Sequence, residues 1–511
     1  MKPKLLVGVV AGAVAVGAAY FTVLAIMGPI DDAAVRLVPT NAAIYANVFI
    51  NPSRTQKREL RELLAEFEKA PTAEEAGDLI AKLADRELSE LGLDYSDDVE
   101  PWLGRQIAFF ATVEDFDDPA AAALVATKDA AATRRFLRDI AEHEDAASEA
   151  LAYKGVDYDY FAAEELASGF VEDFWVVGTE AGFKDVVDSS DGPALADDPG
   201  YERATAPLTD DYLALGYFDT RLIVDAVVSS GELGENEAGA LKAIPGLGSG
   251  VGPGASTIAL SREGVVMDTF APAEGAAGPG LFGELPADSW LGLGFADVGR
   301  SVSSLLDVTG PPGAEAEAGF EAETGLDLRT DLLAWMGDAG IFVKGAGLLG
   351  LGGGAIVEST DPQASTDAVE RMLQIASHAV DIRPAPPVNR TGGFTFTVPE
   401  TPVTVTVMGI GGDRVAVSAG SATGRDALAP AETLVESEAL RDALPTLGDG
   451  FDPVLFVDFD SVERLTASVM GAESPQYKGN VRPWLEPFEH IVSGSKLDDG
   501  GVIARTVIGV E

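Results

Sequence analysis

The chain contains no cysteine, and only three of its 511 residues are histidine. The missing thiols exclude disulfides, thiolate metal sites, iron–sulfur clusters, cysteine nucleophiles and lipid anchors attached to cysteine. Basic residues are also scarce, because 35 Lys and Arg stand against 83 Asp and Glu, which gives a net charge of −48. A surface this acidic repels phosphate, so nucleic acid and anionic lipid surfaces are excluded as partners.

Long apolar runs are scarce as well, with one exception at the N-terminus. Residues 5–30 carry no charge, with two lysines before them and two aspartates after them. As a helix this run would be roughly 39 Å long, enough to cross a hydrocarbon core of ~30 Å. The flanking charges place the N-terminus in the cytoplasm. We therefore predict that residues 1–32 are a single-pass transmembrane anchor and that the rest is extracytoplasmic.

A cleaved signal peptide is the alternative interpretation of the same segment. Ala13-Val14-Ala15 has the small residues of a cleavage site. The chain nevertheless stays apolar from Tyr20 to Met27, so a mature protein starting after Ala15 would begin with an apolar stretch. The sequence favours the uncleaved anchor.

An internal repeat is the most informative feature of the remaining sequence. Residues 92–104 read GLDYSDDVEPWLG and residues 325–337 read GLDLRTDLLAWMG. Neighbouring matches keep the same order, which indicates a duplication of one structural unit. The sequence predicts a first repeat over 33–272, a Gly/Pro/Ala-rich linker over 273–284 and a second repeat over 285–511. The identical pairs are Gly92/Gly325, Leu93/Leu326, Asp94/Asp327, Asp98/Asp331, Trp102/Trp335 and Gly104/Gly337.

Each repeat mixes strands and helices. Apolar stretches such as Ile44–Ile50 predict strands, and alternating Val and Thr over 403–407 are typical of a half-buried strand. Asp129 and Asp361 are predicted to cap equivalent helices. Adjacent strands joined by short turns favour an α+β fold: two tandem homologous repeats with mainly antiparallel sheets flanked by helices.

Several short motifs follow one another in a fixed order after the N-terminal apolar run. They are Pro39, Ala42 or Ala43, Tyr45, Trp102-Leu103-Gly104, Lys128-Asp129, Tyr153-Lys154-Gly155-Val156, Leu195, Asp198-Pro199 and Tyr217-Phe218-Asp219. This order resembles a bacterial, membrane-anchored envelope family known as domain of unknown function 3352. The resemblance covers most of the chain after the anchor, and the second repeat departs from it, with Gly392-Gly393 where Lys154-Gly155 would stand. The resemblance implies a mostly extracytoplasmic protein and carries over no catalytic residues.

Residues that could carry chemistry are few and scattered. His143, His378 and His490 lie far apart in sequence and lack the spacing of a metal site, so we interpret them as surface or helix-end histidines. The Gly-rich stretches 246–254 and 345–354 lack the spacing of phosphate loops and are predicted to be hairpin tips.

Acidic clusters are the remaining candidates: Asp94 with Asp97-Asp98, residues 114–118, Asp157 with Asp159, Asp197-Asp198 and Asp210-Asp211. They lack the spacing of calcium loops, so we interpret them as solvated loops, with weak divalent-cation binding as the alternative. In the repeated motif, Asp94 and Asp98 are predicted to cap a turn, and Trp102 to pack with its indole N–H on a backbone carbonyl. We predict no catalytic, cofactor-binding or metal-binding residues and no cofactor.

These observations predict a non-catalytic binding or scaffolding protein at the cell envelope. Its partners would be the membrane, through residues 1–32, and an envelope protein or an apolar ligand. One alternative is a carrier of a lipid or other apolar ligand. Another is a carboxylate-based hydrolase, which needs two carboxylates roughly 5–10 Å apart in a cleft, one with a raised pKa. The even acidity indicates solubility or adaptation to salt rather than a binding epitope.

Overall fold

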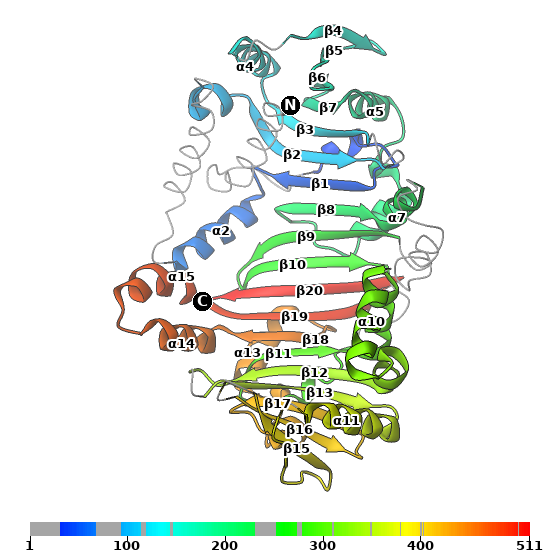
Figure 1. Ribbon diagram of the computed structural model, residues 1–511. Coiled ribbons are helices and arrows are strands. Elements are labelled where there is room, and N and C mark those ends of the chain that lie inside the picture. Colours follow the sequence, from blue (N-terminus) through cyan, green and yellow to red (C-terminus); the bar gives the residue numbers. More distant parts are fainter. Residues whose placement is uncertain are drawn as a thin grey trace. The chain divides into compact units, whose positions relative to one another are not determined.

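The chain is seen in a computed structural model as two compact units, one on each side of the boundary between Pro272 and Ala273. Unit 1 comprises the described residues up to 272, and unit 2 comprises those from 278 onward (Figure 1). The predicted repeat boundaries stay a prediction. The described residues are 31–67, 93–113, 119–143, 147–229, 252–272, 278–308, 311–347, 350–378, 380–398, 401, 403–498 and 500–511.

Unit 1 is built on one antiparallel sheet. Across the sheet the described strands run β4-β5-β6-β7-β3-β2-β1-β8-β9-β10, and every pairing is antiparallel. Their bounds are β1 Ile44–Phe49, β2 Leu103–Ala111, β3 Ala121–Thr127, β4 Glu149–Tyr153, β5 Val156–Phe161, β6 Leu166–Val171, β7 Phe174–Thr179, β8 Ala214–Asp219, β9 Pro253–Ser261 and β10 Gly264–Ala271.

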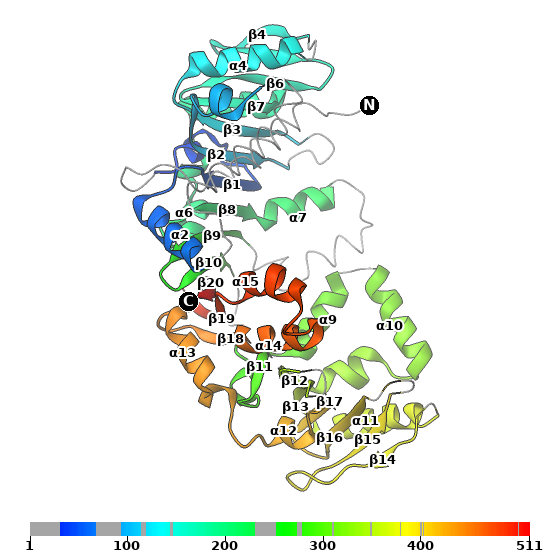
Figure 2. The same ribbon diagram turned by 90° about the vertical axis from the view of Figure 1, so that its left-hand side faces the viewer.

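Helices cover both faces of this sheet. On one face, Phe183 of α5 and Tyr201 of α6 pack against Tyr158 and Tyr217 of the strands. On the other face, α4 and the turn η3 pack with β3 and β7 (Figure 2). The helices and helical turns are η1 Ala34–Leu37, α2 Arg54–Glu66, η3 Tyr95–Val99, α4 Ala130–His143, α5 Glu180–Asp191, η4 Leu195–Asp197, α6 Pro199–Thr205 and α7 Thr220–Ser229.

Unit 2 repeats this arrangement strand for strand. Its described strands run β14-β15-β16-β17-β13-β12-β11-β18-β19-β20, again antiparallel throughout. Strand β11 thus takes the place of β1, and each later strand takes the place of its counterpart. Their bounds are β11 Ser289–Phe295, β12 Met336–Lys344, β13 Gly352–Ser359, β14 Arg383–Pro384, β15 Gly392–Thr397, β16 Thr404–Ile410, β17 Arg414–Gly420, β18 Asp452–Asp458, β19 Phe488–Asp498 and β20 Gly501–Val510.

The helical elements of unit 2 follow its strands in a similar order. Helix α11 follows β13 as α4 follows β3, and α14 follows β18 as α7 follows β8. Helix α9 follows β11 as α2 follows β1, and α13 precedes β18 as α6 precedes β8. The bounds are η5 Phe282–Glu284, α9 Val298–Val308, α10 Pro311–Thr324, η6 Leu328–Leu332, η7 Leu333–Trp335, α11 Pro362–Ala376, α12 Gly424–Leu428, η8 Leu434–Glu436, α13 Glu438–Leu447, α14 Phe459–Met470, η9 Tyr477–Val481 and α15 Arg482–Leu485.

Local sequence explains where these elements begin. The Asp129 carboxylate accepts bonds from the backbone N–H of Ala131 and Ala132, at 3.0 and 2.9 Å. The Asp361 carboxylate accepts bonds from two backbone N–H groups of α11, both at 3.0 Å. These bonds satisfy helix N–H groups that have no intrahelical acceptor. Both predicted caps are confirmed, and the mixed helices and antiparallel strands confirm the predicted α+β class.

Two predictions concern segments that lie wholly or partly outside the described residues. The predicted anchor, residues 5–30, lies outside the described residues. Among the helices that are described, none combines the length and apolar character needed to cross a bilayer. The predicted linker, residues 273–284, is described only from residue 278, and its last residues form η5, where Phe282 is fully buried.

Candidate functional site

An open cleft lies in unit 1 between helix α4 and strands β4, β5 and β6. Its volume is about 950 Å³, within the usual range of small-molecule sites, ~300–1,000 Å³. Figure 2 shows α4 running beside β4 and β6. The cleft therefore lies on the sheet face that α4 covers, at the sheet's β4 end.

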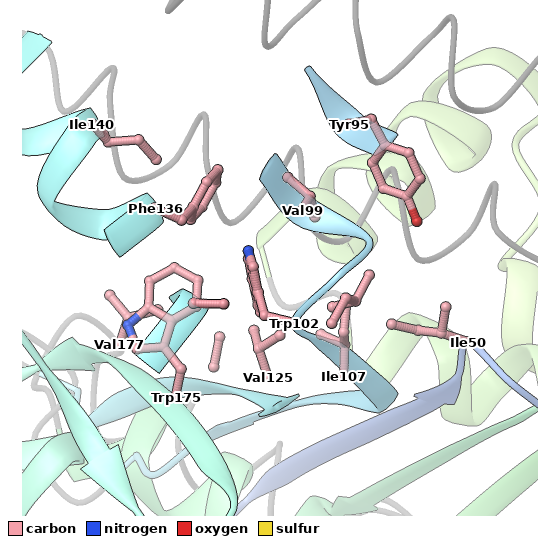
Figure 3. Close-up of a cluster of buried hydrophobic side chains, with 13 residues drawn as sticks. Ile50, Tyr95, Val99, Trp102, Ile107, Val125, Phe136, Ile140, Trp175 and Val177 are labelled. Carbon is pink, nitrogen blue, oxygen red and sulfur yellow. The ribbon is translucent and has the colours of Figure 1, made fainter. Parts of the chain in front are cut away.

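The floor of the cleft is apolar and aromatic. It includes Leu137 and Ile140 of α4, Phe170 of β6 and Trp175 of β7. Trp175 is buried, and its indole N–H donates to the Ser168 hydroxyl at 2.9 Å. These side chains rest on a larger buried cluster, in which Trp175 meets the Trp102 ring edge-on at 6.2 Å (Figure 3). A packed aromatic floor of this kind presents a fixed apolar surface to a ligand.

Two arginines line the cleft from the helix. Arg134 and Arg138 are four residues apart, so they lie on one side of α4. The Arg134 guanidinium stacks over the Phe170 ring, 4.4 Å from its centroid. Neither arginine forms an ion pair within the part of the chain that the structure describes. Their N–H donors therefore face solvent or a ligand, despite the large excess of acidic residues in the chain.

Acidic side chains line the same cleft from the sheet. Asp157 and Asp159 alternate along β5 with Tyr158, whose ring packs on the opposite face against Phe183 at 4.9 Å. Glu164 adds a third carboxylate from the turn after β5. Asp157 and Asp159 also form no ion pair within the described residues, so no direct contact joins them to the two arginines.

The equivalent region of unit 2 has other side chains at the helix positions of the two arginines. Counting from the matched caps Asp129 and Asp361, the helix positions of the two arginines are held by Thr366 and Glu370. Apolar side chains of α11 and the sheet form a cluster there, with the Phe394 and Phe396 rings 6.4 Å apart. The fold can therefore form this region without the arginines.

A second polar cluster lies on the other sheet face of unit 1. The Tyr45 hydroxyl lies 2.8 Å from both Asp32 carboxylate oxygens, and the Gln106 amide donates to Asp32 at 3.2 Å. Burial raises the pKa of the Asp32 carboxyl above its ordinary value, and the bonds from Tyr45, Val35 N–H and Gln106 oppose that rise. The partners that bond to Asp32 among the described residues are thus a phenol, an amide and a backbone N–H.

The repeated Asp/Trp motif proves to be structural, as predicted. The Trp102 indole N–H donates to the Asp98 carbonyl at 2.6 Å, and Trp335 donates to the Asp331 carbonyl at 3.2 Å. Asp94 accepts bonds from the backbone N–H of two following residues, at 3.0 and 3.2 Å. Each motif thus joins a capped turn to the strand that follows it.

One prediction about the histidines is wrong. His378 is exposed just after α11, and its Nδ1 lies 2.8 Å from the Gln374 carbonyl, as expected of a helix-end histidine. His490 instead lies inside strand β19 and is 8% exposed, and burial lowers its pKa. His143 ends α4. The sequence around His490 does not predict that this side chain is buried, because its burial depends on how β19 pairs with the neighbouring strands.

The other acidic and glycine-rich motifs have backbone roles where they are described. Asp198 caps α6, accepting bonds from Gly200 and Tyr201 N–H at 2.7 and 3.0 Å. The stretch 345–354 joins β12 to β13, as expected of a hairpin tip. Residues 114–118 and most of 246–254 lie outside the described residues. Within the described ranges, no three His, Asp or Glu side chains are grouped so that they could hold a metal ion.

Comparison with known proteins places the chain in a family. A family described as "Protein of unknown function (DUF3352)" matches residues 5–498, nearly the whole chain. The chain belongs to this family. The resemblance inferred from the motif order is thereby confirmed.

Two further comparisons carry no information about the function of this DUF3352 protein. No curated protein matches it. Among solved structures, crystal forms I and IV of TP0453 match with 12% identity and TM-scores of 0.23 and 0.25. They cover 49% and 47% of this chain, and 81% and 79% of TP0453. No inference about function follows from a likeness this low.

Sequence reasoning missed the two cleft arginines of this DUF3352 protein, and it interpreted Asp157 and Asp159 as part of a solvated loop, whereas they lie on strand β5 and line the cleft. The arginines belong to one helix and the aspartates to a strand beyond it, and no motif joins them. One signal was present in the sequence: aligning the two repeats from Asp129 and Asp361 places Thr366 and Glu370 opposite the two arginines. A difference between two copies of one fold marks positions that the fold itself does not require.

Proposed function

We propose that this protein is a non-catalytic binding protein of the cell envelope. In this proposal residues 1–32 hold it to the membrane, and the two units descend from one duplicated α+β unit and face outward. The apolar run with its flanking charges supports the anchor. The common strand order of the two units supports the duplication.

The observation that carries the binding role is the cleft beneath α4. A volume of about 950 Å³ above an aromatic floor suits a molecule with an apolar body. The floor is held by a buried core, so the surface exists before a ligand arrives, which limits the entropic cost of binding. Among the alternatives, this favours a carrier of an apolar ligand over a pure scaffold.

A hydrolase has less support. The raised carboxylate pKa belongs to Asp32, whose partners are a phenol and an amide, while the cleft acids belong to other elements. A carboxylate mechanism needs both groups in one site.

The binding role is tested with an environment-sensitive naphthalene dye and the full chain. Ala141 lines the cleft on α4, and its counterpart in unit 2 is Leu373. Ala141→Phe should fill the cleft and weaken dye binding about tenfold, equivalent to ~1.4 kcal/mol. Ala131→Phe, at an exposed position of the same helix outside the cleft, is the matched control. Equal binding by both variants would remove the cleft from the proposal.

The envelope location is tested separately with intact cells. A protease added outside should degrade both units and spare a tag fused before Met1. Protection of the units together with loss of the tag would reverse the proposed orientation.

A further inference from the structure

We infer that the cleft beneath α4 binds a zwitterionic amphiphile, a single apolar chain carrying a phosphate and an ammonium group. This inference rests on the proposed binding role and adds the chemical class of the ligand. It starts from the unpaired charges of both signs that line one cleft.

The arginine wall supplies the contacts for an anionic group. Arg134 and Arg138 stand one helical turn apart, and neither forms an ion pair within the described residues. Stacking on Phe170 holds one face of the Arg134 guanidinium and leaves its edge donors available. A planar guanidinium presents a rigid fork of N–H donors that matches phosphate oxygens. Two such groups a turn apart can share one phosphate.

The strand wall supplies the contacts for a cationic group. Asp157 and Asp159 lie on the same side of β5 and line the cleft opposite the helix. A purely anionic ligand would be repelled by these carboxylates, and a purely cationic ligand would be repelled by the arginines. A headgroup with both charges satisfies both walls at once, so charge complementarity favours the zwitterion.

Unit 2 supports a ligand role for these charges. At the matched helix positions it has Thr366 and Glu370, and apolar side chains of α11 and the sheet form a cluster in the same region. Since the same strand order forms without the arginine pair, packing alone does not account for Arg134 and Arg138. The apolar floor of Leu137, Ile140 and Phe170 then takes the chain of the amphiphile.

The test compares four amphiphiles that share one chain and differ in headgroup. They are dodecylphosphocholine, dodecanoate, dodecyltrimethylammonium and dodecylmaltoside, each titrated below its critical micelle concentration into the full chain. Calorimetry measures binding, and a chain brominated near its end should quench Trp175 fluorescence. The zwitterion should bind about tenfold or more tighter than the neutral maltoside, because hydrogen bonds to charged groups contribute most.

Two double variants test the arginine wall and the aspartate wall of the cleft separately. Arg134→Gln with Arg138→Gln, and Asp157→Asn with Asp159→Asn, should each remove most of the preference for the zwitterion and leave maltoside binding unchanged. Asparagine is isosteric with aspartate, and glutamine keeps the start of the arginine side chain without its charge, so a change in maltoside binding would indicate a structural effect instead.

Matched controls use the same chemistry outside the cleft. Arg135→Gln on α4 and Asp173→Asn in the turn between β6 and β7 should leave all four affinities unchanged, since neither residue lines the cleft.

The outcomes distinguish this inference from the proposed function. Equal binding of all four headgroups, or a preference for dodecanoate that survives the arginine changes, would overturn the zwitterion and keep the binding role. Binding of none of the four would overturn both.

Discussion

Trp102 is predicted to support both the local core and the cleft floor, whereas its counterpart Trp335 supports unit 2 alone. Trp102 is 3% exposed, and its ring lies 5.2 Å from Phe136 and 6.2 Å from Trp175. Its indole N–H donates to the Asp98 carbonyl at 2.6 Å. The change to test is Trp102→Phe, which keeps an aromatic ring and removes the indole donor.

The magnitude follows from these contacts. Truncating a buried tryptophan to alanine costs about 3–5 kcal/mol, a large part of a typical domain stability of ~5–15 kcal/mol. Phenylalanine retains most of the apolar area, so the loss is about 1 kcal/mol for the hydrogen bond and about 0.5–1.5 kcal/mol for the weakened ring contact. We expect the local free energy of opening to fall by ~1–3 kcal/mol in α4, β3 and β7.

Hydrogen exchange with mass spectrometry measures this effect by segment, which suits a chain of two units better than one melting curve. Trp102→Phe should speed exchange in α4 and β7 and weaken dye binding in the cleft. Trp335→Phe, which removes a longer 3.2 Å bond, should speed exchange in α11 and leave the cleft affinity unchanged. Unchanged exchange in α4, or an equal loss of cleft affinity in both variants, would refute the reasoning.

Three further predictions concern unit 1 and its matched positions. Asp32→Ala leaves the buried Tyr45 hydroxyl without its acceptor and should lower the free energy of unfolding by about 1–3 kcal/mol in urea, whereas exposed Asp31→Ala should change it by under ~0.5 kcal/mol. Because the pKa of Asp32 is raised in the folded state, the folded protein keeps a proton that the unfolded chain releases above about pH 4. The stability that this group contributes is therefore full below that pH and is lost as pH rises through the folded pKa. Urea titrations of wild type and Asp32→Asn over this window should show a difference in unfolding free energy that changes with pH in this direction. Gly104→Ala would place a Cβ 2.6 Å from the backbone of the neighbouring strand and should cost about 1–3 kcal/mol, while Gly337→Ala, with 3.2 Å to a side-chain methyl, should cost less than ~1 kcal/mol in the same assay.

Features that depend on neighbours in sequence were predictable. The Asp129 cap and the Trp102 bond to the Asp98 carbonyl each span four residues or fewer. Such bonds form as soon as the local backbone takes its shape, so the residue pattern alone predicts them.

Features that depend on distant pairing were not predictable. Gln106 reaches Asp32 across 74 residues, and Gln56 bonds the backbone of Leu260 across 204. In α2 the polar Gln56 is buried, whereas Leu60 of the same helix is only partly buried. A sheet assembled from distant strands decides which helix face is covered, and this overrides the periodicity of a short helix.

The sequence by itself therefore determined the family, the α+β class, the capped turns and the duplication signal, because all of these are recorded in short motifs and their order. Only the tertiary structure decided that a cleft lies between α4 and strands β4–β6, and that Arg134 and Asp157 both line it. The physical reason is that side-chain volume and charge act between elements that only the assembled sheet brings together. At matched positions unit 1 has Trp175 in the strand and two arginines in the helix, where unit 2 has Val415, Thr366 and Glu370.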